Sequence, residues 1–284
     1  MVKDRTGMMP LISVIIPTYN RLGFLKEAVA SVKAQSFRDY ELIIVDDGST
    51  DDTADWLAQQ EFLSIRLQHS GRPGKVRNAG AAIAKGQYLA FLDSDDLWLP
   101  EKLAEQQRFF AQNPGLAICH TKEIWKRSGK IISQRRQRHQ KQGYIFADAL
   151  HKCIIGPSTV MLAKDLFYQL GGFAEDLEIA EDYELWLRLT AQYEVGYIDK
   201  PLVEKRAGHA DQLSAKYGQI EIFRLQALLR TLSSNTWTCE QERLIKAEIV
   251  KKSLIYARGA FKRGKLAEAQ AYLNIAKQFA PAEA

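Results

Sequence analysis

The sequence predicts an α/β fold in which helices flank a mostly parallel sheet and a helical tail follows. In the first half of the chain, short runs of branched apolar residues alternate with segments whose apolar residues recur at helical spacing. Continuous apolar runs are typical of strands buried on both faces of a parallel sheet. Their alternation with helices predicts βαβ units with right-handed crossovers. From residue 219 onward the pattern is helical throughout.

Residues 11–92 contain four predicted strands. The first, 11–16, is apolar except for Ser13 and is followed by helical spacing from Leu22 to Val32. The other strands are expected at 41–45, 63–67 and 88–92, with helical stretches at 51–57 and 75–85 between them.

The second half is less regular. Residues 117–132 are predicted to form a pair of strands that includes Trp125. The later expectations are a strand at 159–162, a turn at 171–173, a helix at 181–192, two strands around 195–198 and 202–205, and a helical hairpin at 253–279. The hairpin looks like a single tetratricopeptide-type unit, which needs neighbours to bury its apolar face. We therefore expect it to pack on the main domain.

Composition places the chain among ordinary globular proteins. Of 284 residues, 46% are hydrophobic and 26% charged, which argues against a disordered or fibrous class. The net charge of +5 is too small to indicate a nucleic-acid partner. Three scattered cysteines offer neither a disulfide framework nor a paired metal motif, and they fit a reducing, cytoplasmic location. The apolar run at 11–16 is too short for a signal peptide or a membrane span.

Positive charge is concentrated in residues 122–141. Against one acid, Glu123, this segment holds eight basic residues: Lys122, Lys126, Arg127, Lys130, Arg135, Arg136, Arg138 and Lys141. One interpretation is a solvated loop. The other is docking on an anionic membrane or a lipid-linked acceptor, which would make the protein peripheral at the inner face of the membrane.

Three carboxylates follow the predicted strand at 88–92. Asp93, Asp95 and Asp96 lie where ligands gather in α/β sheets, at the carboxyl end of a strand. Like charges this close repel unless a cation holds them together, and Mg²⁺ or Mn²⁺ prefers such oxygen ligands together with substrate phosphates. The alternative is a helix that begins at Asp96 with acids in its first turn. We favour a metal and diphosphate site.

A second acidic strand end is Asp46-Asp47-Gly48-Ser49. A carboxylate here can accept a hydrogen bond from a nucleobase or a ribose hydroxyl, although a turn and helix cap would also explain the pattern. No GxGxxG follows the first strand and no GxxxxGK[ST] occurs, so the usual phosphate-binding loops are missing. Phosphate charge must then be met by a metal and by side chains such as Arg77.

Several ordered motifs together resemble family 2 glycosyltransferases. They are VIIPTYNR at 14–21, VDDGSTD at 45–51, RNAG at 77–80, FLDSDD at 91–96, GGF at 171–173 and AEDYELWLRL at 180–189. The resemblance covers about residues 10–215. It implies a GT-A, Rossmann-like domain at 1–215, with a nucleotide-sugar half at 10–98 and an acceptor half at 99–215. Residues 216–284 would be a helical extension.

The resemblance also implies roles for individual residues. Thr18 and Asp47 would contact the nucleobase, Arg77 the base or ribose, and Asp182 would be the general base. Asp93 and Asp95 would form the DxD pair that holds ribose and a divalent metal, Mn²⁺ or Mg²⁺, with His209 as a further metal ligand. The nucleotide-sugar-binding set is Pro17, Thr18, Tyr19, Asn20, Asp47, Arg77, Asp93, Ser94 and Asp95. From the residues alone, Asp182 could equally be an acid at a helix N-terminus, and His209 a solvated side chain.

The expected activity is sugar transfer with inversion from a nucleotide-diphosphate sugar to a hydroxyl of a sugar, glycolipid or polysaccharide acceptor, in surface polysaccharide or glycolipid synthesis. Two other hypotheses remain. An aspartate-based phosphatase would use Asp93 and Asp95, but that chemistry wants its aspartates after the first strand, not the fourth. A non-catalytic nucleotide-sugar or protein-binding module would not need Asp182.

Overall fold

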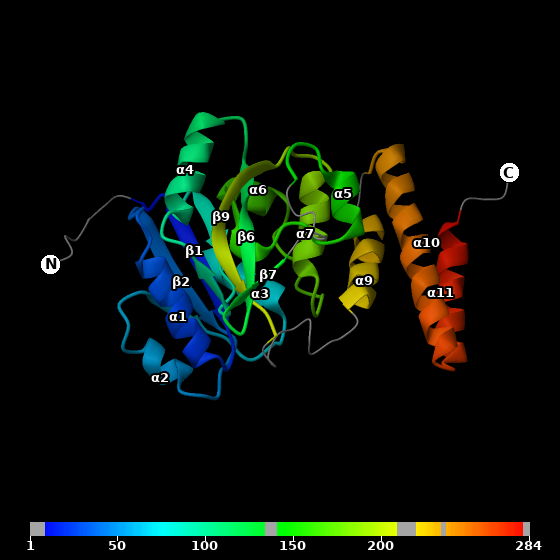
Figure 1. Cartoon of the computed structure of the whole chain (residues 1–284), viewed down its shortest axis with the longest axis horizontal. Coiled ribbons are helices and arrows are strands. Elements are labelled where there is room, and N and C mark those ends of the chain that lie inside the picture. Colours follow the sequence, from blue (N-terminus) through cyan, green and yellow to red (C-terminus); the bar gives the residue numbers. More distant parts are fainter. Residues whose placement is uncertain (1–8, 134–140, 209–219, 234–236, 281–284) are drawn as a thin grey trace.

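The computed structural model describes residues 9–133, 141–208, 220–233 and 237–280. Its centre is a nine-stranded mixed sheet with strand order β3-β2-β1-β4-β8-β6-β9-β5, and β7 pairs with β6 (Figure 1). The strands are β1 (Ile12–Thr18), β2 (Tyr40–Asp46), β3 (Leu63–Arg66), β4 (Tyr88–Phe91), β5 (Asp96–Trp98), β6 (Ile118–Arg127), β7 (Lys130–Ile132), β8 (Val160–Ala163) and β9 (Gly196–Arg206).

The first four strands are parallel and lie close to their predicted positions. β1 pairs with β2 and β4, and β2 pairs with β3. Alternate side chains of β1 enter different cores: Ile15 packs in one hydrophobic cluster, whereas Val14 and Ile16 pack in the other. Because both faces are buried, most positions of the strand are apolar, and the buried Ser13 hydroxyl donates to Glu41 Oε1 at 2.6 Å. The crossovers are α1 (Leu22–Lys33), α2 (Thr53–Leu57) and α3 (Pro73–Ile83).

The rest of the sheet differs from the sequence-based expectation in two places. No helix begins at Asp96, because residues 96–98 form β5 and pair antiparallel with β9; α4 (Lys102–Gln112) starts later. The two strands expected near 195 and 202 are one strand, β9. The register of its pairing with the parallel strand β6 shifts on either side of Lys122, and the pairing continues past Pro201 to Arg206. The pair of strands predicted at 117–132 is present as β6 and β7.

Helices cover the second half of the sheet and form the end of the described chain. They are α5 (Phe146–His151), the 3₁₀ turn η1 (Pro157–Thr159), α6 (Lys164–Gln169), α7 (Glu181–Thr190), α9 (Ile220–Ser233), α10 (Cys239–Lys262) and α11 (Leu266–Phe279). α11 packs beside the C-terminal part of α10, as predicted for the hairpin at 253–279 (Figure 1). None of these helices is long and apolar enough to cross a bilayer, in the described ranges.

The C-terminal helices share the main core. Leu225 and Leu228 of α9 and Ile249 of α10 belong to the same apolar cluster as Trp186 of α7. The boundary predicted at residue 215 falls in 209–219, outside the described residues. The division into domains therefore stays a prediction.

A glycine between α3 and β4 allows a close backbone contact. A Cβ on Gly86 would lie 2.5 Å from the backbone nitrogen of Ser13 in β1. We expect Gly86→Ala to lower the free energy of unfolding by about 2 kcal/mol, because β1 must move away from it. Gly115, which has open space at its Cβ position, is the matched control, and Gly115→Ala should change the value by less than about 0.5 kcal/mol. Urea unfolding measures both, and equal effects would contradict the packing argument.

Candidate active site

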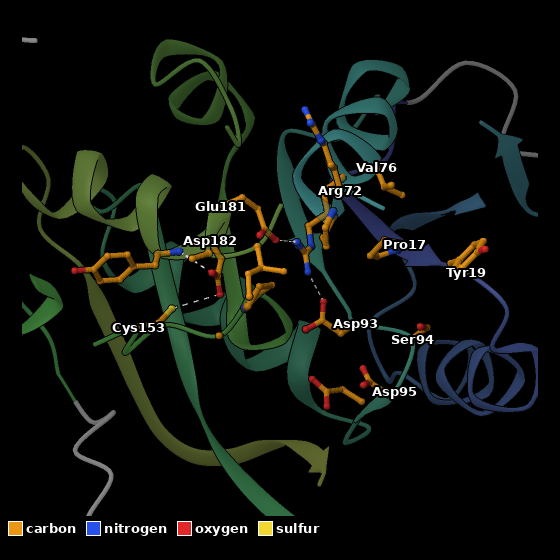
Figure 2. Close-up of a pocket in the computed structure, with 18 of the residues that line it drawn as sticks. Pro17, Tyr19, Arg72, Val76, Asp93, Ser94, Asp95, Cys153, Glu181 and Asp182 are labelled. Carbon is orange, nitrogen blue, oxygen red and sulfur yellow. Dashed lines mark hydrogen bonds and ion pairs between the residues drawn. The ribbon is translucent and has the colours of Figure 1, made fainter. Parts of the chain in front are cut away.

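A pocket of about 610 Å³ lies where the carboxyl ends of β1, β2 and β4 meet the start of α7. Figure 2 shows Asp93 and Asp95 on one side of this space and Asp182 with Cys153 on the other. Most of the predicted site residues that the structure describes line it: Pro17, Thr18, Tyr19, Asp47, Arg77, Asp93, Ser94, Asp95 and Asp182. The fold therefore gathers side chains that are far apart in the sequence.

Of the other two predicted residues, Asn20 is described but does not line the pocket, and His209 is not described. Asn20 has a left-handed backbone, φ +49°, and its side-chain oxygen accepts a hydrogen bond from the Thr50 amide at 2.7 Å. The backbone amide of Asn20 donates to Ser49 Oγ. Asn20 thus joins the loops after β1 and β2 and is not among the residues around the pocket. His209 lies outside the described residues, so its predicted metal contact stays a prediction.

Arg77 links two acidic groups from distant parts of the chain. It is buried, and its guanidinium donates to Asp93 Oδ1 at 2.6 Å and to Glu181 Oε1. Burial alone lowers the pKa of Arg77, but the carboxylates of Asp93 and Glu181 raise it above its usual value. Arg77 therefore stays charged and ties the end of β4 to the start of α7. Its predicted contact with the base or ribose stays a prediction.

The packing of α3 explains why Arg77 reaches this position. Pro73 lies in the first turn, where proline is favoured. Gly80, one turn after Arg77, lets the helix lie close to the sheet, since a Cβ there would be 2.6 Å from Ile15 and 2.9 Å from Val45. The RNAG motif thus combines a charged residue at the pocket with a small one at the helix–sheet contact.

The three acids after β4 have different surroundings. Asp96 is buried, and its carboxylate accepts from Ser158 Oγ at 2.5 Å and lies 3.5 Å from Lys205 Nζ. Burial raises the pKa of Asp96 to about 7, with Lys205 opposing the shift. Asp93 and Asp95 are partly exposed to the pocket, where Asp95 is 3.4 Å from Arg21. Burial disfavours a charged Asp93, yet Arg77 and Lys205 hold the pKa of its carboxyl below the usual value.

The donor set of Asp93 and Asp95 fits a hard divalent cation only in part. Within the described ranges, no group of three or more His, Cys, Asp or Glu side chains could hold a metal. Two carboxylates that face the pocket do fit Mg²⁺ or Mn²⁺ when diphosphate and water oxygens complete the coordination. A metal held here would thus depend on the nucleotide.

Asp47 is held by a loop that sequence reasoning missed. Its carboxylate accepts hydrogen bonds from the backbone amides of Ser70 at 3.0 Å and Gly71 at 2.9 Å, and His69 Nδ1 lies 3.0 Å away. The His69 ring stacks on Tyr19, with centroids 3.9 Å apart. The loop follows β3, whose carboxyl end lies beside that of β2 in the parallel sheet. Because the carboxyl ends of neighbouring parallel strands meet at one edge, the position of this loop directly after β3 could have indicated that it contacts Asp47.

Thr18 offers an unused polar atom to the pocket. Its Oγ1 is buried and has no hydrogen-bond partner in the described part of the chain. A buried polar group without a partner is costly, and a ligand in the pocket could supply the missing hydrogen bond. An unpaired hydroxyl is consistent with the predicted contact between Thr18 and the nucleobase. That contact stays a prediction.

The start of α7 presents Asp182 to the pocket. Asp182 Oδ1 accepts from the Tyr183 amide at 2.7 Å, and the Cys153 thiol donates to its Oδ2 at 3.4 Å. Before the helix, Ala180 adopts a left-handed backbone, φ +68°, which is unusual for a residue with a side chain. Strain of this kind is tolerated where the surrounding structure fixes it and is common at functional sites. Glu181 turns toward Arg77, and burial raises its pKa to about 7 although Arg77 opposes the shift.

The far end of the pocket contains residues that sequence reasoning did not select. Cys153 and Lys152 come from the segment after α5, and Ile220 and Arg224 come from α9. The Arg224 guanidinium lies 6.0 Å from the centre of the Tyr183 ring. The helical extension thus contributes to the pocket wall, which its sequence pattern alone did not indicate.

Removing the Arg77 guanidinium is expected to destabilise the fold strongly. Arg77→Met leaves Asp93 and Glu181 without their shared partner, and breaking a buried ion pair costs about 3 kcal/mol or more. Arg108→Met is the control, because its ion pair with Glu105 is exposed and contributes less than about 1 kcal/mol. Urea denaturation gives both values, and a loss at Arg77 no larger than at Arg108 would contradict the bridging role.

Comparison with known proteins identifies the family. A family model described as "Glycosyl transferase family 2" matches residues 13–171, which is more than half of the chain. The chain belongs to glycosyl transferase family 2. Within this family 2 chain, the matched region includes Thr18, Asp47, Arg77, Asp93 and Asp95 and ends before Asp182.

Relatives of this family 2 chain carry glycosyltransferase names. An uncharacterized glycosyltransferase of Rickettsia felis is 36% identical over 199 residues, covering 69% of this chain and 33% of the relative. The chain thus spans about a third of that relative's length. TuaG of Bacillus subtilis, a putative teichuronic acid biosynthesis glycosyltransferase, is 33% identical over 65% of this chain and 73% of its own. WfgD of Escherichia coli, a UDP-Glc:alpha-D-GlcNAc-diphosphoundecaprenol beta-1,3-glucosyltransferase, is 29% identical over 66% of this chain and 73% of its own.

Solved structures confirm the GT-A fold predicted for this family 2 chain. S. aureus TarS 1-349 in complex with UDP-GlcNAc has a TM-score of 0.76 at 22% identity, covering 95% of this chain and 80% of TarS. The mannosyltransferase PcManGT from Pyrobaculum calidifontis, solved with GDP-Man and Mn²⁺, has a TM-score of 0.65 at 17% identity, covering 97% of this chain and 77% of its own. At these identities the likeness concerns the fold alone.

Proposed function

We propose that this protein is an inverting, metal-dependent glycosyltransferase that moves a sugar from a nucleotide-diphosphate sugar to an acceptor hydroxyl. The observation that carries the proposal is the arrangement of one pocket, in which Asp93 and Asp95 lie on one side and Asp182 on the other (Figure 2). Direct inversion needs a base on the face of the sugar opposite the leaving diphosphate. In this proposal, Asp182 on one side of the pocket is the base, and Asp93 and Asp95 on the other side hold the leaving diphosphate through a metal.

In the proposed mechanism, Asp182 accepts the proton of the acceptor hydroxyl while the oxygen of that hydroxyl bonds to the anomeric carbon of the donor. The bond from that carbon to the diphosphate breaks in the same step, and no covalent intermediate with the protein forms. The Tyr183 amide and the Cys153 thiol hold the Asp182 carboxylate in place. Arg77 and Glu181 fix the start of α7 relative to the acids after β4.

Asp95 and Asp93 would hold Mn²⁺ or Mg²⁺ together with the diphosphate oxygens. Asp95 would be the more direct ligand, because Arg77 binds Asp93 at 2.6 Å whereas Arg21 lies 3.4 Å from Asp95. The ion would stabilise negative charge that develops on the leaving diphosphate. Thr18 and Asp47 would bind the base. Structural neighbours bind UDP-GlcNAc in one case and GDP-Man with Mn²⁺ in another, which supports a nucleotide-sugar donor.

For the acceptor we propose a sugar, glycolipid or polysaccharide used in cell-surface polymer synthesis. TuaG is named for teichuronic acid biosynthesis, and the WfgD acceptor is a diphospholipid-linked sugar. A cytoplasmic protein with a peripheral contact at the inner face of the membrane would meet such an acceptor.

The test is a panel of UDP-, GDP- and dTDP-sugars incubated with the protein in Mn²⁺ or in EDTA, with release of the free nucleotide diphosphate followed by chromatography. We expect at least one donor to be hydrolysed slowly with metal and none in EDTA. A phosphatase would instead release phosphate from p-nitrophenyl phosphate. A binding module would bind a nucleotide sugar without turning it over. Either result would overturn the proposal.

A further inference from the structure

The end of the C-terminal hairpin carries a concentrated positive charge. Residues 251–265 contain six basic residues and no acidic one: Lys251, Lys252, Arg258, Lys262, Arg263 and Lys265. The whole chain has 39 basic and 34 acidic residues, so the net positive charge per residue in this segment is far above the average of the chain. The segment covers the last part of α10 and the turn into α11.

Large apolar side chains are exposed among these cations. Phe261 is 67% exposed, Leu266 63% and Ile255 61%. Every residue from 261 to 267 is exposed. We call the surface formed by Ile255, Arg258, Phe261, Lys262, Arg263, Lys265 and Leu266 the hairpin tip. Exposed aromatic and aliphatic side chains beside basic ones are typical of surfaces that insert into a membrane interface.

Much of the charge at the hairpin tip is not neutralised by the described residues. Among the described residues, Arg258, Lys262 and Arg263 have no acidic partner, and Lys265 pairs with Glu268 at 3.1 Å within α11. In the basic segment 122–141, by contrast, three of the five described cations form ion pairs with acids of other segments, namely Lys122 with Asp199, Lys126 with Glu204 and Lys141 with Asp148. The described part of that segment therefore has less positive charge to offer than its sequence suggested.

We propose that the hairpin tip docks the protein on an anionic lipid bilayer. The cations would meet lipid phosphates while Phe261, Leu266 and Ile255 enter the headgroup region. A second copy of this surface would bring like charges together, which argues against self-association through it. In Figure 1 the turn between α10 and α11 lies at the lower end of the hairpin, toward the same edge as the end of β9, whose Lys205 and Arg206 line the pocket.

This inference deepens the proposed function, since it names the surface that would bring the pocket to a lipid-linked acceptor. It is tested without any donor or acceptor, so its failure and that of the proposed function can be told apart. The assay is sedimentation of the full chain with vesicles of phosphatidylcholine alone or with phosphatidylglycerol. We expect binding to the anionic vesicles only, weakening as salt is raised.

Two variants probe the two parts of the surface. Lys262→Gln/Arg263→Gln should lower the vesicle partition coefficient about 25-fold, since each cation near an anionic surface contributes about a factor of five. Phe261→Ser/Leu266→Ser should weaken it by about tenfold or more through lost apolar burial. The control is Arg243→Gln/Lys246→Gln, which makes the same change in net charge about 28 Å away along α10, at two cations that pair with Glu240 and Glu242. It should alter partitioning by less than about twofold, because the distance exceeds the Debye length.

All four positions of the tip variants are exposed, so circular dichroism and melting should match the parent. The proposal is overturned if the parent does not bind anionic vesicles at low salt. It is also overturned if the control weakens binding as much as the tip variants, because the effect then reflects net charge alone. If Phe261→Ser/Leu266→Ser converts a dimer into a monomer in sedimentation equilibrium and vesicle binding is unchanged, the tip is a contact between copies instead.

Discussion

Asp182→Asn is expected to lower kcat for sugar transfer about 10³-fold while the affinity for the donor changes by less than about twofold. The amide cannot accept the acceptor's proton, yet it can keep the hydrogen bond from the Tyr183 amide, so the local structure should survive. Steady-state kinetics with the donor found in the panel, together with calorimetric donor binding, separates the two quantities.

Asp165→Asn is a matched control for this substitution. Like Asp182, Asp165 lies in the first turn of a helix, here α6, but it does not line the pocket. If Asp182 were only an acid at a helix N-terminus, both variants would lose a few tenths of a kcal/mol in stability and keep their activity. A kcat for Asp182→Asn within about tenfold of the parent would exclude the base role.

Asp95→Ala is expected to weaken binding of the nucleotide diphosphate in Mn²⁺ by about 100-fold and to lower kcat at least as much. The affinity measured in EDTA should change little, because the lost contribution depends on the metal. Asp93→Ala would be a less clean test, since it also frees Arg77 from one of its two partners. Tryptophan fluorescence titrations with and without Mn²⁺ measure the effect.

The control for the metal experiment is Asp52→Ala. Asp52 is an exposed acid in the loop after β2, and it makes no side-chain cap for α2. It should leave the response to Mn²⁺ unchanged. If Asp95→Ala and Asp52→Ala respond alike, Asp95 does not hold the metal.

The sheet shows which parts of a fold a sequence can reveal. β1, β2 and β4 were predictable because each is apolar on both faces and lies between helical segments, so the pattern within a few residues decides the structure. β5 was not predictable in this way. Its three residues, Asp96 to Trp98, are extended because they pair with Val203 to Lys205 of β9, more than a hundred positions away. The local sequence does not indicate a pairing partner so far away in the chain.

The site follows the same rule. Asp47, Asp93 and Asp95 could be predicted because parallel strands bring their carboxyl ends to one edge, so the order of the motifs already implied a shared pocket. The link from Arg77 to Glu181 joins positions 104 residues apart, and Cys153 reaches Asp182 across 29 residues. These contacts arise from how α7 packs against α3 and the segment after α5. No spacing in the sequence indicates that packing.

The pocket is expected to bind a nucleotide-diphosphate sugar through a divalent metal. Isothermal titration calorimetry with UDP, GDP and dTDP, in Mn²⁺ and in EDTA, tests this expectation most directly. We expect at least one nucleotide to bind in Mn²⁺ with an affinity at least about tenfold higher than in EDTA, because Asp93 and Asp95 would hold the ion together with the diphosphate. Equal affinity in the two conditions, or no binding of any of the three nucleotides in Mn²⁺, would contradict it.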